Sequence, residues 1–270
     1  MKKRVVISAG AGGIGRAVAE AFLADGADVF VCDYDAEALE DIQRKHNGVR
    51  TFQADVRDPE AIDAFFDAIE IEERAGDHPG IDVLVNNAGV SGPTARLEDI
   101  ALDDWRQTID IDLNSFFYFS RRAIPMLRRA GGGSIVNMAS NAAFFGFPLR
   151  SPYAACKWAV IGLTKTMAME LGGDQIRVNA ICPCSVEGPR IQRVIEKDAK
   201  ARGLAVETVA AEYKRQSSLQ TFVTNDDIVA MINFLTSPAG RHISGQAIGL
   251  DGHTESLSLA IPESARQQAS

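Results

Sequence analysis

Short, continuous apolar runs alternate along the chain with longer stretches of helical periodicity. The runs span residues 4–8, 28–32, 49–52, 81–85, 134–138, 176–181 and 246–250. Between them, apolar residues recur every three or four positions, which predicts helices over 14–22, 36–45, 59–74, 103–129, 152–171, 189–215 and 224–235. Uninterrupted apolar strands are buried on both faces, and strand–helix alternation is typical of a parallel sheet covered by helices. The pattern therefore predicts an α/β fold, a doubly wound parallel sheet of about seven strands with helices on both faces.

The chain is expected to form a single domain over residues 1–270. This length is enough for one large domain and too short for two comfortable ones, and no linker, low-complexity segment or internal repeat divides it. The segment at about 189–215 is charge-rich, mostly helical and long for a plain connection, so we interpret it as a helical substrate lid. The tail after Gly252 has no clear pattern. The apolar residues of this tail that could pack on a partner subunit are Leu257, Leu259 and Ile261.

Composition narrows the partners and the compartment. The formal net charge is −8 and the sequence pI is about 5.1, which argues against nucleic acid as a main partner. No apolar run approaches the roughly 18–20 residues that span a bilayer, and the apolar stretch near the N-terminus is too short for a signal peptide. Cys32, Cys156, Cys182 and Cys184 form no Cys-x-x-Cys pair, and histidines do not cluster with them. We therefore expect a cytoplasmic protein with reduced thiols and no metal site.

A glycine-rich turn connects the first predicted strand to the first helix. Gly10, Gly12 and Gly15 give the pattern Gly-x-Gly-x-x-Gly, which brings backbone N–H groups at a helix start close to a pyrophosphate. Asp33 ends the second strand, where a carboxylate accepts hydrogen bonds from ribose hydroxyls and repels a 2′-phosphate. The next residue is Tyr34 and not an arginine that could accommodate a 2′-phosphate. The pattern therefore predicts a Rossmann-like domain that binds NAD in preference to NADP. The alternative is that Asp33 caps the following helix or is solvated.

The stretch from Ser140 to Lys157 carries the candidate chemistry. Tyr153 and Lys157 lie four residues apart at the start of a predicted helix and therefore share one face. An ammonium group beside a phenol lowers the pKa of the phenol, which makes tyrosine usable as a proton donor and acceptor near neutral pH. Ser140, at the carboxyl end of the fifth strand, is placed to hydrogen-bond the same substrate oxygen. By spacing alone the pair also fits the surface of an ordinary helix, and the glycine turn favours the chemical interpretation.

Taken together, these segments resemble the short-chain dehydrogenases/reductases in their single-domain form, from Arg4 to about Gly252. Residues 8–15 align with that family's glycine turn, 55–56 with its acidic pair at the adenine, and 86–89 with its Asn-Asn-Ala-Gly motif. The resemblance implies cofactor contacts from Gly10, Gly12, Gly13, Ile14, Gly15, Asp33, Asp55, Val56, Asn86, Ala88, Gly89, Tyr153, Lys157, Pro183 and Val186. It implies catalytic roles for Ser140, Tyr153, Lys157 and Asp112.

Four positions depart from the family's pattern. Ala9 stands at the first glycine of the turn, where Gly10 is expected to restore conformational freedom. Asp112 stands at the family's catalytic asparagine, whose backbone carbonyl helps to hold a water between the lysine and solvent. Aspartate keeps that carbonyl, and its extra carboxylate is expected to alter the pKa values of the lysine and the tyrosine. Cys184 replaces a glycine and Gly188 a hydroxyl residue near the pyrophosphate, so both bear on cofactor affinity.

The resemblance implies an NAD-dependent oxidoreductase that interconverts an alcohol and a ketone or aldehyde by hydride transfer. Tyr153 would act as general acid/base, Lys157 would bind the nicotinamide ribose, and Ser140 would orient the substrate oxygen. The substrate would be a small alcohol, polyol, sugar or hydroxy acid. A 3-oxoacyl-thioester reductase is the alternative, disfavoured by Asp33 because biosynthetic reduction usually uses NADPH. A non-catalytic NAD-binding regulatory protein is a further alternative. Family members are commonly homotetramers or dimers, with the helices over 103–129 and 152–171 as candidate interfaces.

The substrate pocket is expected from residues 91–96, 141–150 and the insertion after Val186. An apolar wall would come from Phe144, Phe145 and Phe147. An anionic group on the substrate would meet Arg150, Arg190 or Arg193. The alternatives are that the phenylalanines belong to the core or a subunit contact and that the arginines are solvated or ion-paired on the surface.

Overall fold

The computed structural model describes residues 2–74 and 78–254 of the chain. Within them, parallel strands form a seven-stranded sheet in the order β3-β2-β1-β4-β5-β6-β7. The strands are β1 (Arg4–Ser8), β2 (Asp28–Asp33), β3 (Val49–Gln53), β4 (Val83–Asn86), β5 (Gly133–Met138), β6 (Ile176–Pro183) and β7 (Ala247–Leu250). The predicted doubly wound parallel sheet is confirmed. Its order reverses between β1 and β4, and in such sheets ligands bind at the carboxyl ends of the strands beside that reversal.

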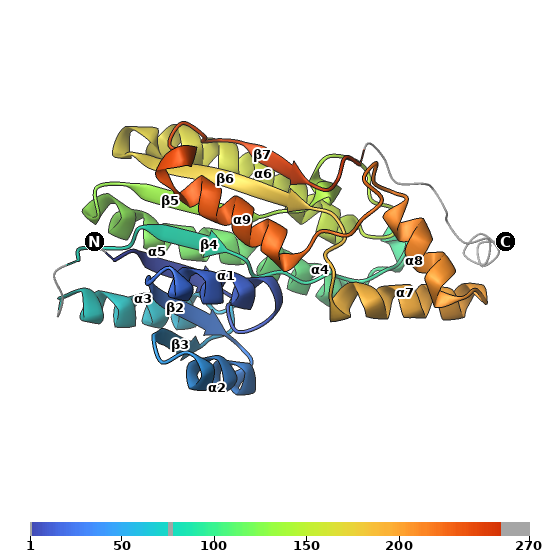
Figure 1. Cartoon of the computed structure of the whole chain (residues 1–270), viewed down its shortest axis with the longest axis horizontal. Coiled ribbons are helices and arrows are strands. Elements are labelled where there is room, and N and C mark those ends of the chain that lie inside the picture. Colours follow the sequence, from blue (N-terminus) through green and yellow to red (C-terminus); the bar gives the residue numbers. More distant parts are fainter. Residues whose placement is uncertain (1, 75–77, 255–270) are drawn as a thin grey trace.

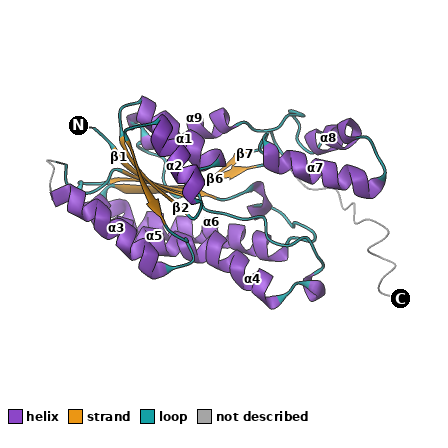
Figure 2. Cartoon of the chain, turned by 90° about the horizontal axis from the view of Figure 1, so that it is seen from below, coloured by secondary structure: helices purple, strands orange, loops and turns teal. Residues whose placement is uncertain are grey.

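Helices cover both faces of the sheet (Figure 2). One face carries α1 (Gly13–Ala24), α2 (Ala36–Lys45) and α9 (Asn225–Thr236). The other carries α3 (Pro59–Arg74), α4 (Leu102–Ile109), α5 (Ser115–Arg129) and α6 (Ser151–Leu171). The insertion forms α7 (Pro189–Arg202) and α8 (Val206–Lys214), which extend beyond the carboxyl ends of the strands (Figure 1). In the described part of the chain, no helix is both long and apolar enough to cross a bilayer.

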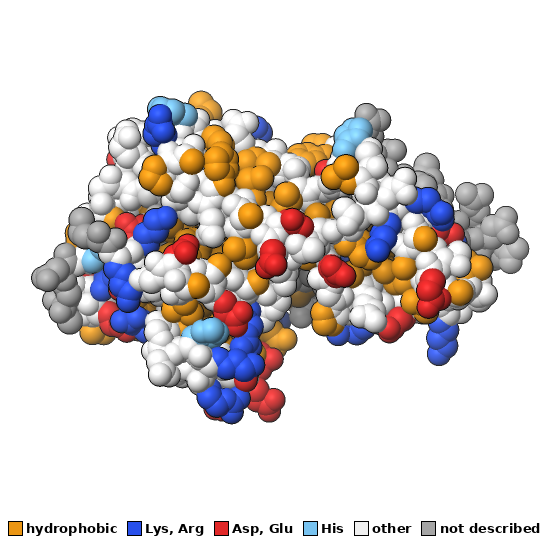
Figure 3. All heavy atoms as spheres, in the orientation of Figure 1, with side chains coloured by type: hydrophobic (Ala, Val, Ile, Leu, Met, Phe, Trp, Pro, Cys, Tyr) orange, Lys and Arg blue, Asp and Glu red, His pale blue; other side chains and the backbone are white. Residues whose placement is uncertain are grey.

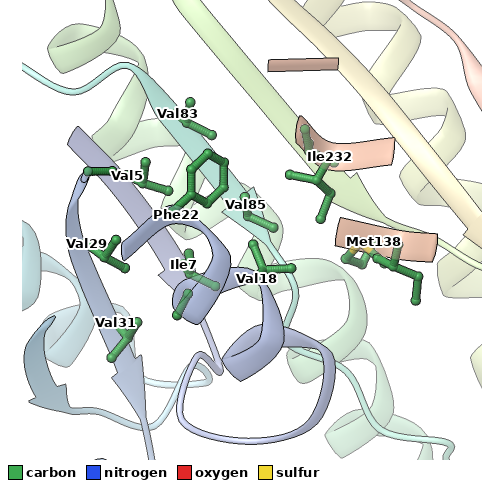
Figure 4. Close-up of a cluster of buried hydrophobic side chains, with 14 of the residues drawn as sticks. Val5, Ile7, Val18, Phe22, Val29, Val31, Val83, Val85, Met138 and Ile232 are labelled. Carbon is green, nitrogen blue, oxygen red and sulfur yellow. The ribbon is translucent and has the colours of Figure 1, made fainter. Parts of the chain in front are cut away.

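Two apolar layers, one on each face of the sheet, explain the continuous apolar runs. Val5 and Ile7 of β1 join Phe22 of α1 in the first layer (Figure 4), whereas Val6 between them belongs to the second. In the second layer Phe66 of α3 meets Phe119 of α5 edge to face, with ring centroids 5.7 Å apart. Full burial of each such side chain contributes about 1.5–3 kcal/mol to stability. The core therefore lies within the sheet–helix sandwich and leaves the carboxyl ends of the strands available for a site.

The predicted helical zone over 103–129 is interrupted by a π-helical turn. This turn, η2 (Asp110–Asn114), separates α4 from α5 and contains Asp112, whose side chain is buried. A π turn holds one residue more than an α turn and is frequent at functional sites. The hydrophobic periodicity does not reveal it, because both flanking helices keep their apolar faces on the sheet.

The α7–α8 pair has a small apolar cluster of its own, formed by Ile195, Ala199 and Val209. The lower part of the face in Figure 3 carries a dense group of charges around α2, where Asp41 pairs with Arg16 and Lys45. The candidate contact residues Leu257, Leu259 and Ile261 lie outside the described residues.

Candidate functional site

The glycine turn after β1 packs against the protein on one side and faces open space on the other. A Cβ atom on Gly10 would lie 2.7 Å from Cγ1 of Val31, and one on Gly15 would overlap the carbonyl oxygen of Ala9. Around Gly12 and Gly13, by contrast, an added Cβ would meet nothing within 4 Å. No side chain caps the start of α1. The backbone N–H groups there are consequently suited to a phosphate, and the turn fits a dinucleotide.

Ala9 itself adopts the left-handed conformation that this turn requires, with φ of 51°. The expectation that Gly10 supplies the conformational freedom is wrong. Gly10 is needed for its close approach to Val31, whereas the left-handed conformation lies at the preceding alanine. For a residue with a Cβ, this conformation costs about 1–2 kcal/mol.

Asp33 lies at the end of β2 beside the glycine turn and is 7% exposed. Its Oδ2 accepts a hydrogen bond from the N–H of Ala11 at 3.2 Å, and its Oδ1 accepts one from the N–H of Asp35 at 3.2 Å. The helix α2 is capped by Asp35, whose Oδ1 accepts from the N–H of Ala38 at 3.1 Å. Asp33 is therefore held against the turn and is not the helix cap that the alternative interpretation supposes.

The Asn-Asn-Ala-Gly segment after β4 supports both the sheet and the turn. Asn86 is buried and donates from Nδ2 to Oδ1 of Asn137 at 2.8 Å. Asn87 donates from Nδ2 to the carbonyl oxygens of Ser8 and Ala9 at 3.2 and 3.0 Å. Asn87 thus holds the glycine turn in place. The sequence does not single it out as a site residue, although its position in the Asn-Asn-Ala-Gly motif could have indicated this role.

The remaining predicted cofactor residues lie outside the glycine turn and the Asn-Asn-Ala-Gly segment. The carboxylate of Asp55 pairs with the guanidinium of Arg57, and hydrogen bonds from that group lower the pKa of Asp55. Val56 is partly buried against the second apolar layer. Pro183 ends β6. Pro183 and Gly188 both line the cavity described below, and the φ of 146° at Gly188 disfavours any residue with a side chain. An adenine contact at Asp55 and Val56 remains a prediction.

A cavity of about 600 Å³ joins the glycine turn to the Ser140–Lys157 stretch. Ser140, Tyr153 and Lys157 all line it, together with Gly13 and Ile14 of the turn. Ser140 follows β5, and its Oγ accepts a hydrogen bond from the N–H of Ala142 at 3.2 Å, which fixes the side chain at the strand end. The structure therefore brings three of the four predicted catalytic side chains and part of the predicted cofactor site to one cavity, and the fourth, Asp112, is not among its lining residues.

Lys157 and Asp112 form a buried ion pair at the base of this cavity. The Nζ of Lys157 lies 3.3 Å from Oδ2 of Asp112 and donates to the carbonyl oxygen of Met138 at 3.2 Å. The other oxygen of Asp112, Oδ1, accepts from the N–H of Val90 at 2.7 Å. Burial alone would lower the pKa of Lys157, but the charges of Asp112 and Tyr153 outweigh it and raise the pKa above its ordinary value of 10.5. The ammonium group of Lys157 is therefore kept charged.

The aromatic wall is smaller than the sequence predicts. Phe147 lines the cavity, with its ring centroid 6.3 Å from that of Tyr153. Phe144 and Phe145 are not among the lining residues, and Phe144 is 40% exposed. Two lining residues that the sequence does not single out are Tyr213 of the insertion and Phe222, which follows it. Their only signal is their apolar character, which is equally typical of a core position.

The candidate arginines are separated by the fold. Arg150 lines the cavity, whereas Arg193 is exposed on α7 and is not among the lining residues. The side chain of Arg190 lies outside the described part of the structure. Of the three arginines considered for binding an anionic group of the substrate, Arg150 is thus the one that the structure places beside the predicted catalytic residues.

The four cysteines are free thiols, and three of them are fully buried. Burial raises the pKa values of Cys32, Cys156 and Cys182 to about 12 and also raises that of Cys184, which lines the cavity. Among the residues that the structure describes, no group of histidine, cysteine, aspartate and glutamate side chains is arranged to hold a metal ion.

Comparisons with known proteins match nearly the whole chain. A family model described as enoyl-(acyl carrier protein) reductase matches residues 9–253. A 3-oxoacyl-[acyl-carrier-protein] reductase of Thermotoga maritima is 34% identical over 255 residues, 93% of this chain and 96% of that protein. A D-beta-hydroxybutyrate dehydrogenase of Cupriavidus necator is 34% identical over 260 residues, with the same shares covered.

Solved structures agree with these sequence matches. An actinorhodin polyketide ketoreductase with NADPH has a TM-score of 0.85 and 27% identity, covering 93% of this chain and 96% of its own. A 3-ketoacyl-(acyl-carrier-protein) reductase from Brucella melitensis, complexed with NADH, has a TM-score of 0.79 and 25% identity, covering 93% and 97%. The similarity therefore extends from the glycine turn to the end of β7.

Proposed function

The chain belongs to the short-chain dehydrogenase/reductase family, whose members are oxidoreductases acting on alcohols and ketones, and we propose that it is an NAD-dependent member. Its substrate would be a small alcohol, polyol, sugar or hydroxy acid. The observation that carries this proposal is the shared cavity, which is lined by Ser140, Tyr153 and Lys157 and reaches the glycine turn.

The chemistry is divided between the cofactor and the side chains. A bound nicotinamide cofactor supplies the acceptor or donor of hydride. Tyr153 moves the proton to or from the substrate oxygen, and Ser140 orients that oxygen with its Oγ. Lys157 contributes a positive charge, with Nζ 5.5 Å from the ring centroid of Tyr153, where it would stabilise negative charge that develops on the reacting oxygens.

Asp112 is a positioning residue in this scheme. Its carboxylate holds Lys157 by the ion pair and is itself fixed by the N–H of Val90. A negative charge beside Lys157 keeps the lysine protonated but offsets part of the field that the lysine exerts on Tyr153. Lys157 would therefore stay charged to a higher pH than it would with asparagine at position 112.

The choice of NAD over NADP rests on Asp33. The carboxylate is held beside the glycine turn, where ribose hydroxyls would donate to it and a 2′-phosphate would meet a like charge. The similar structures hold either cofactor, NADH in one and NADPH in the other, so the argument depends on this residue.

The proposal includes homo-oligomeric assembly and a cytoplasmic location. Phe117 on α5 is 55% exposed and Trp158 on α6 is 52% exposed, which supports packing of these helices in a homodimer or homotetramer. The α7–α8 pair carries cavity residues and is suited to act as the substrate lid. Free cysteines fit a cytoplasmic location.

A substrate screen tests the proposal. Purified protein is incubated with NAD and a panel of alcohols, polyols, sugars and hydroxy acids, and NADH formation is followed by absorbance. Oxidation of at least one class supports the proposal. Reduction of a 3-oxoacyl thioester with NADPH, without NAD-dependent oxidation of the panel, would favour the alternative reductase, the activity named for the Thermotoga maritima relative.

A further inference from the structure

One wall of the cavity is a tight turn that carries apolar side chains. The N–H of Arg150 donates to the carbonyl oxygen of Phe147 at 3.3 Å, which closes a turn with Pro148 and Leu149 at its centre. Phe147, Pro148 and Leu149 all line the cavity and form what we call the turn wall. The ring of Phe147 lies beside that of Tyr153, with centroids 6.3 Å apart. The turn wall therefore begins at the proposed catalytic tyrosine.

Leu149 adopts a backbone conformation that is usual for glycine. Its φ is 65°, and a proline followed by a residue with positive φ is the arrangement of a type II turn, where glycine or asparagine is preferred at the second of these positions. The N–H of Ala95 donates to the carbonyl oxygen of Leu149 at 3.0 Å and holds the turn against the segment after β4. Bulky residues rarely take this conformation, and such positions cluster at ligand sites. The fold thus keeps an apolar side chain on the cavity wall where the backbone favours glycine.

A second group of apolar lining residues comes from the α7–α8 insertion. Ile191 and Val194 of α7 lie three residues apart and share one helix face, and Tyr213 of α8 lines the cavity with them. We call these three residues the insertion wall. Ile191 and Tyr213 pack on one side against the small apolar cluster of the insertion, whereas Val194 is 40% exposed. Apolar side chains that are held by the protein and face a cavity gain from contact with an apolar ligand.

The polar side chains of the lining include two hydroxyl groups with protein partners and two longer groups at exposed positions. Oγ1 of Thr94 accepts a hydrogen bond from Nη1 of Arg150 at 2.8 Å, and the hydroxyl of Thr221 donates to the carbonyl oxygen of the next residue at 3.2 Å. Glu187 and Gln216 line the cavity from exposed positions. A ligand with many hydroxyl groups needs a partner for each one that it buries, whereas an apolar body needs none. The lining is consequently better suited to an apolar body than to a polyol or a sugar.

We propose that the substrate is an alcohol with a bulky apolar body, alicyclic or aromatic, that packs against the turn wall and the insertion wall. Its hydroxyl group meets Ser140 and Tyr153. This inference rests on the proposed function and narrows its substrate class. Contact with both walls removes hydrocarbon surface from water and orients the carbinol carbon. kcat/KM should therefore rise with the apolar surface of the substrate, by about fourfold for each methylene group that the cavity buries.

Matched pairs of alcohols test the substrate class in the wild-type protein. Cyclohexanol is assayed with NAD beside inositol, which carries a hydroxyl group on every carbon of the same ring. 2-Hexanol is assayed beside a six-carbon sugar alcohol, and 2-butanol and 2-octanol extend the chain series. kcat/KM should be at least about tenfold higher for the apolar member of each pair and should increase from 2-butanol to 2-hexanol.

Two substitutions make the walls polar with little change in side-chain size. Leu149→Asn introduces a residue that tolerates the positive φ, and Val194→Thr exchanges a methyl group for a hydroxyl. With the best apolar alcohol, kcat/KM should fall about 5–20-fold in Leu149→Asn and about two- to fivefold in Val194→Thr, mainly through KM. The controls Leu219→Asn and Val206→Thr make the same changes at exposed positions outside the lining and should stay within about twofold of wild type.

Cofactor binding separates loss of the walls from loss of the fold. The NADH dissociation constant of every variant, from cofactor fluorescence, should stay close to that of wild type. Preference for inositol or the sugar alcohol over the apolar partner, or equal losses in the wall variants and their controls, would overturn the proposal and leave the proposed function standing. Absence of NAD-dependent oxidation of every alcohol tested would overturn both. The matched pairs decide the substrate class in the wild-type protein even where a variant does not fold.

Discussion

The cofactor end and the substrate end of this site are built in different ways. At the cofactor end, the side chains of Asn87 and Asp33 are joined to the backbone of the glycine turn by hydrogen bonds, and two glycines leave no room for a Cβ. At the substrate end, a cavity is lined by side chains from the ends of β5 and β6, the start of α6 and the insertion. The first arrangement depends on local geometry, which few sequences satisfy. The substrate end depends on how segments that are far apart in the sequence pack together, and many different sequences can form a cavity in this way.

Tyr153→Phe separates the two ends most clearly and has the largest expected effect. Loss of the phenolic hydroxyl removes the proposed proton donor, so kcat should fall by about 10²–10⁴-fold. The cofactor end is untouched, so the dissociation constant for NADH should change by less than about twofold. Steady-state rates with the best substrate of the screen and a fluorescence titration check both. Turnover close to wild type would contradict the assignment of Tyr153.

Gly15→Ala should damage the cofactor end without altering the substrate end. Its Cβ would overlap the carbonyl oxygen of Ala9 and lie 2.5 Å from Nδ2 of Asn87, so we expect a loss of about 1–3 kcal/mol in the free energy of unfolding. Gly12→Ala is the matched control, because an added Cβ there meets nothing within 4 Å and the backbone is extended. Denaturant unfolding without cofactor should leave this control within about 0.5 kcal/mol of wild type. Equal losses in both variants would show that the close approach at Gly15 is unimportant.

Asp112→Asn tests the link between the buried ion pair and the proton relay. The amide removes the charge that raises the pKa of Lys157, so burial then lowers that pKa. The alkaline limb of the pH profile of kcat/KM for alcohol oxidation should move to lower pH, with about tenfold or less change at the optimum. A profile that stays in place or moves upward would contradict the role of Asp112.

The same pair also affects stability with a definite sign. Because the folded-state pKa of Lys157 lies above its ordinary value of 10.5, the pair stabilises the protein below pH 10.5, and this contribution is lost as pH rises through the higher value. Unfolding measured from about pH 9 to about pH 12 should therefore show a loss of stability that begins above about pH 10.5 and is smaller in Asp112→Asn.

Ala9→Gly should give the smallest change, and in the stabilising direction. Glycine adopts a φ of 51° without the steric cost of a Cβ, although it loses more entropy on folding, so we expect a gain of about 0.5–1 kcal/mol. Thermal unfolding of the apoprotein measures it. A loss of stability would indicate that the methyl group of Ala9 makes a packing contribution larger than the strain.

The cofactor end was largely predictable because its signals are local. The glycine spacing, Asp33 and the motif at 86–89 each lie at or directly after the carboxyl end of a strand, where the fold places its ligand sites. What could not be predicted depends on tertiary packing. The periodicity could not show that Ala9 carries the left-handed conformation or that the π turn directs Asp112 to Lys157. Nor could it show that Tyr213 reaches the cavity while Phe144 does not.

Cofactor binding can be measured before any substrate is known, and it tests the proposed NAD dependence most directly. Purified wild-type protein, Asp33→Ser and Asp35→Ser are titrated with NADH and with NADPH. The control variant removes the same charge two residues away and keeps a hydroxyl that can cap α2. Wild type and Asp35→Ser should bind NADH at least about tenfold more tightly than NADPH, a difference of about 1.4 kcal/mol, and Asp33→Ser should lose this preference. Equal or tighter binding of NADPH by the wild-type protein would contradict the account.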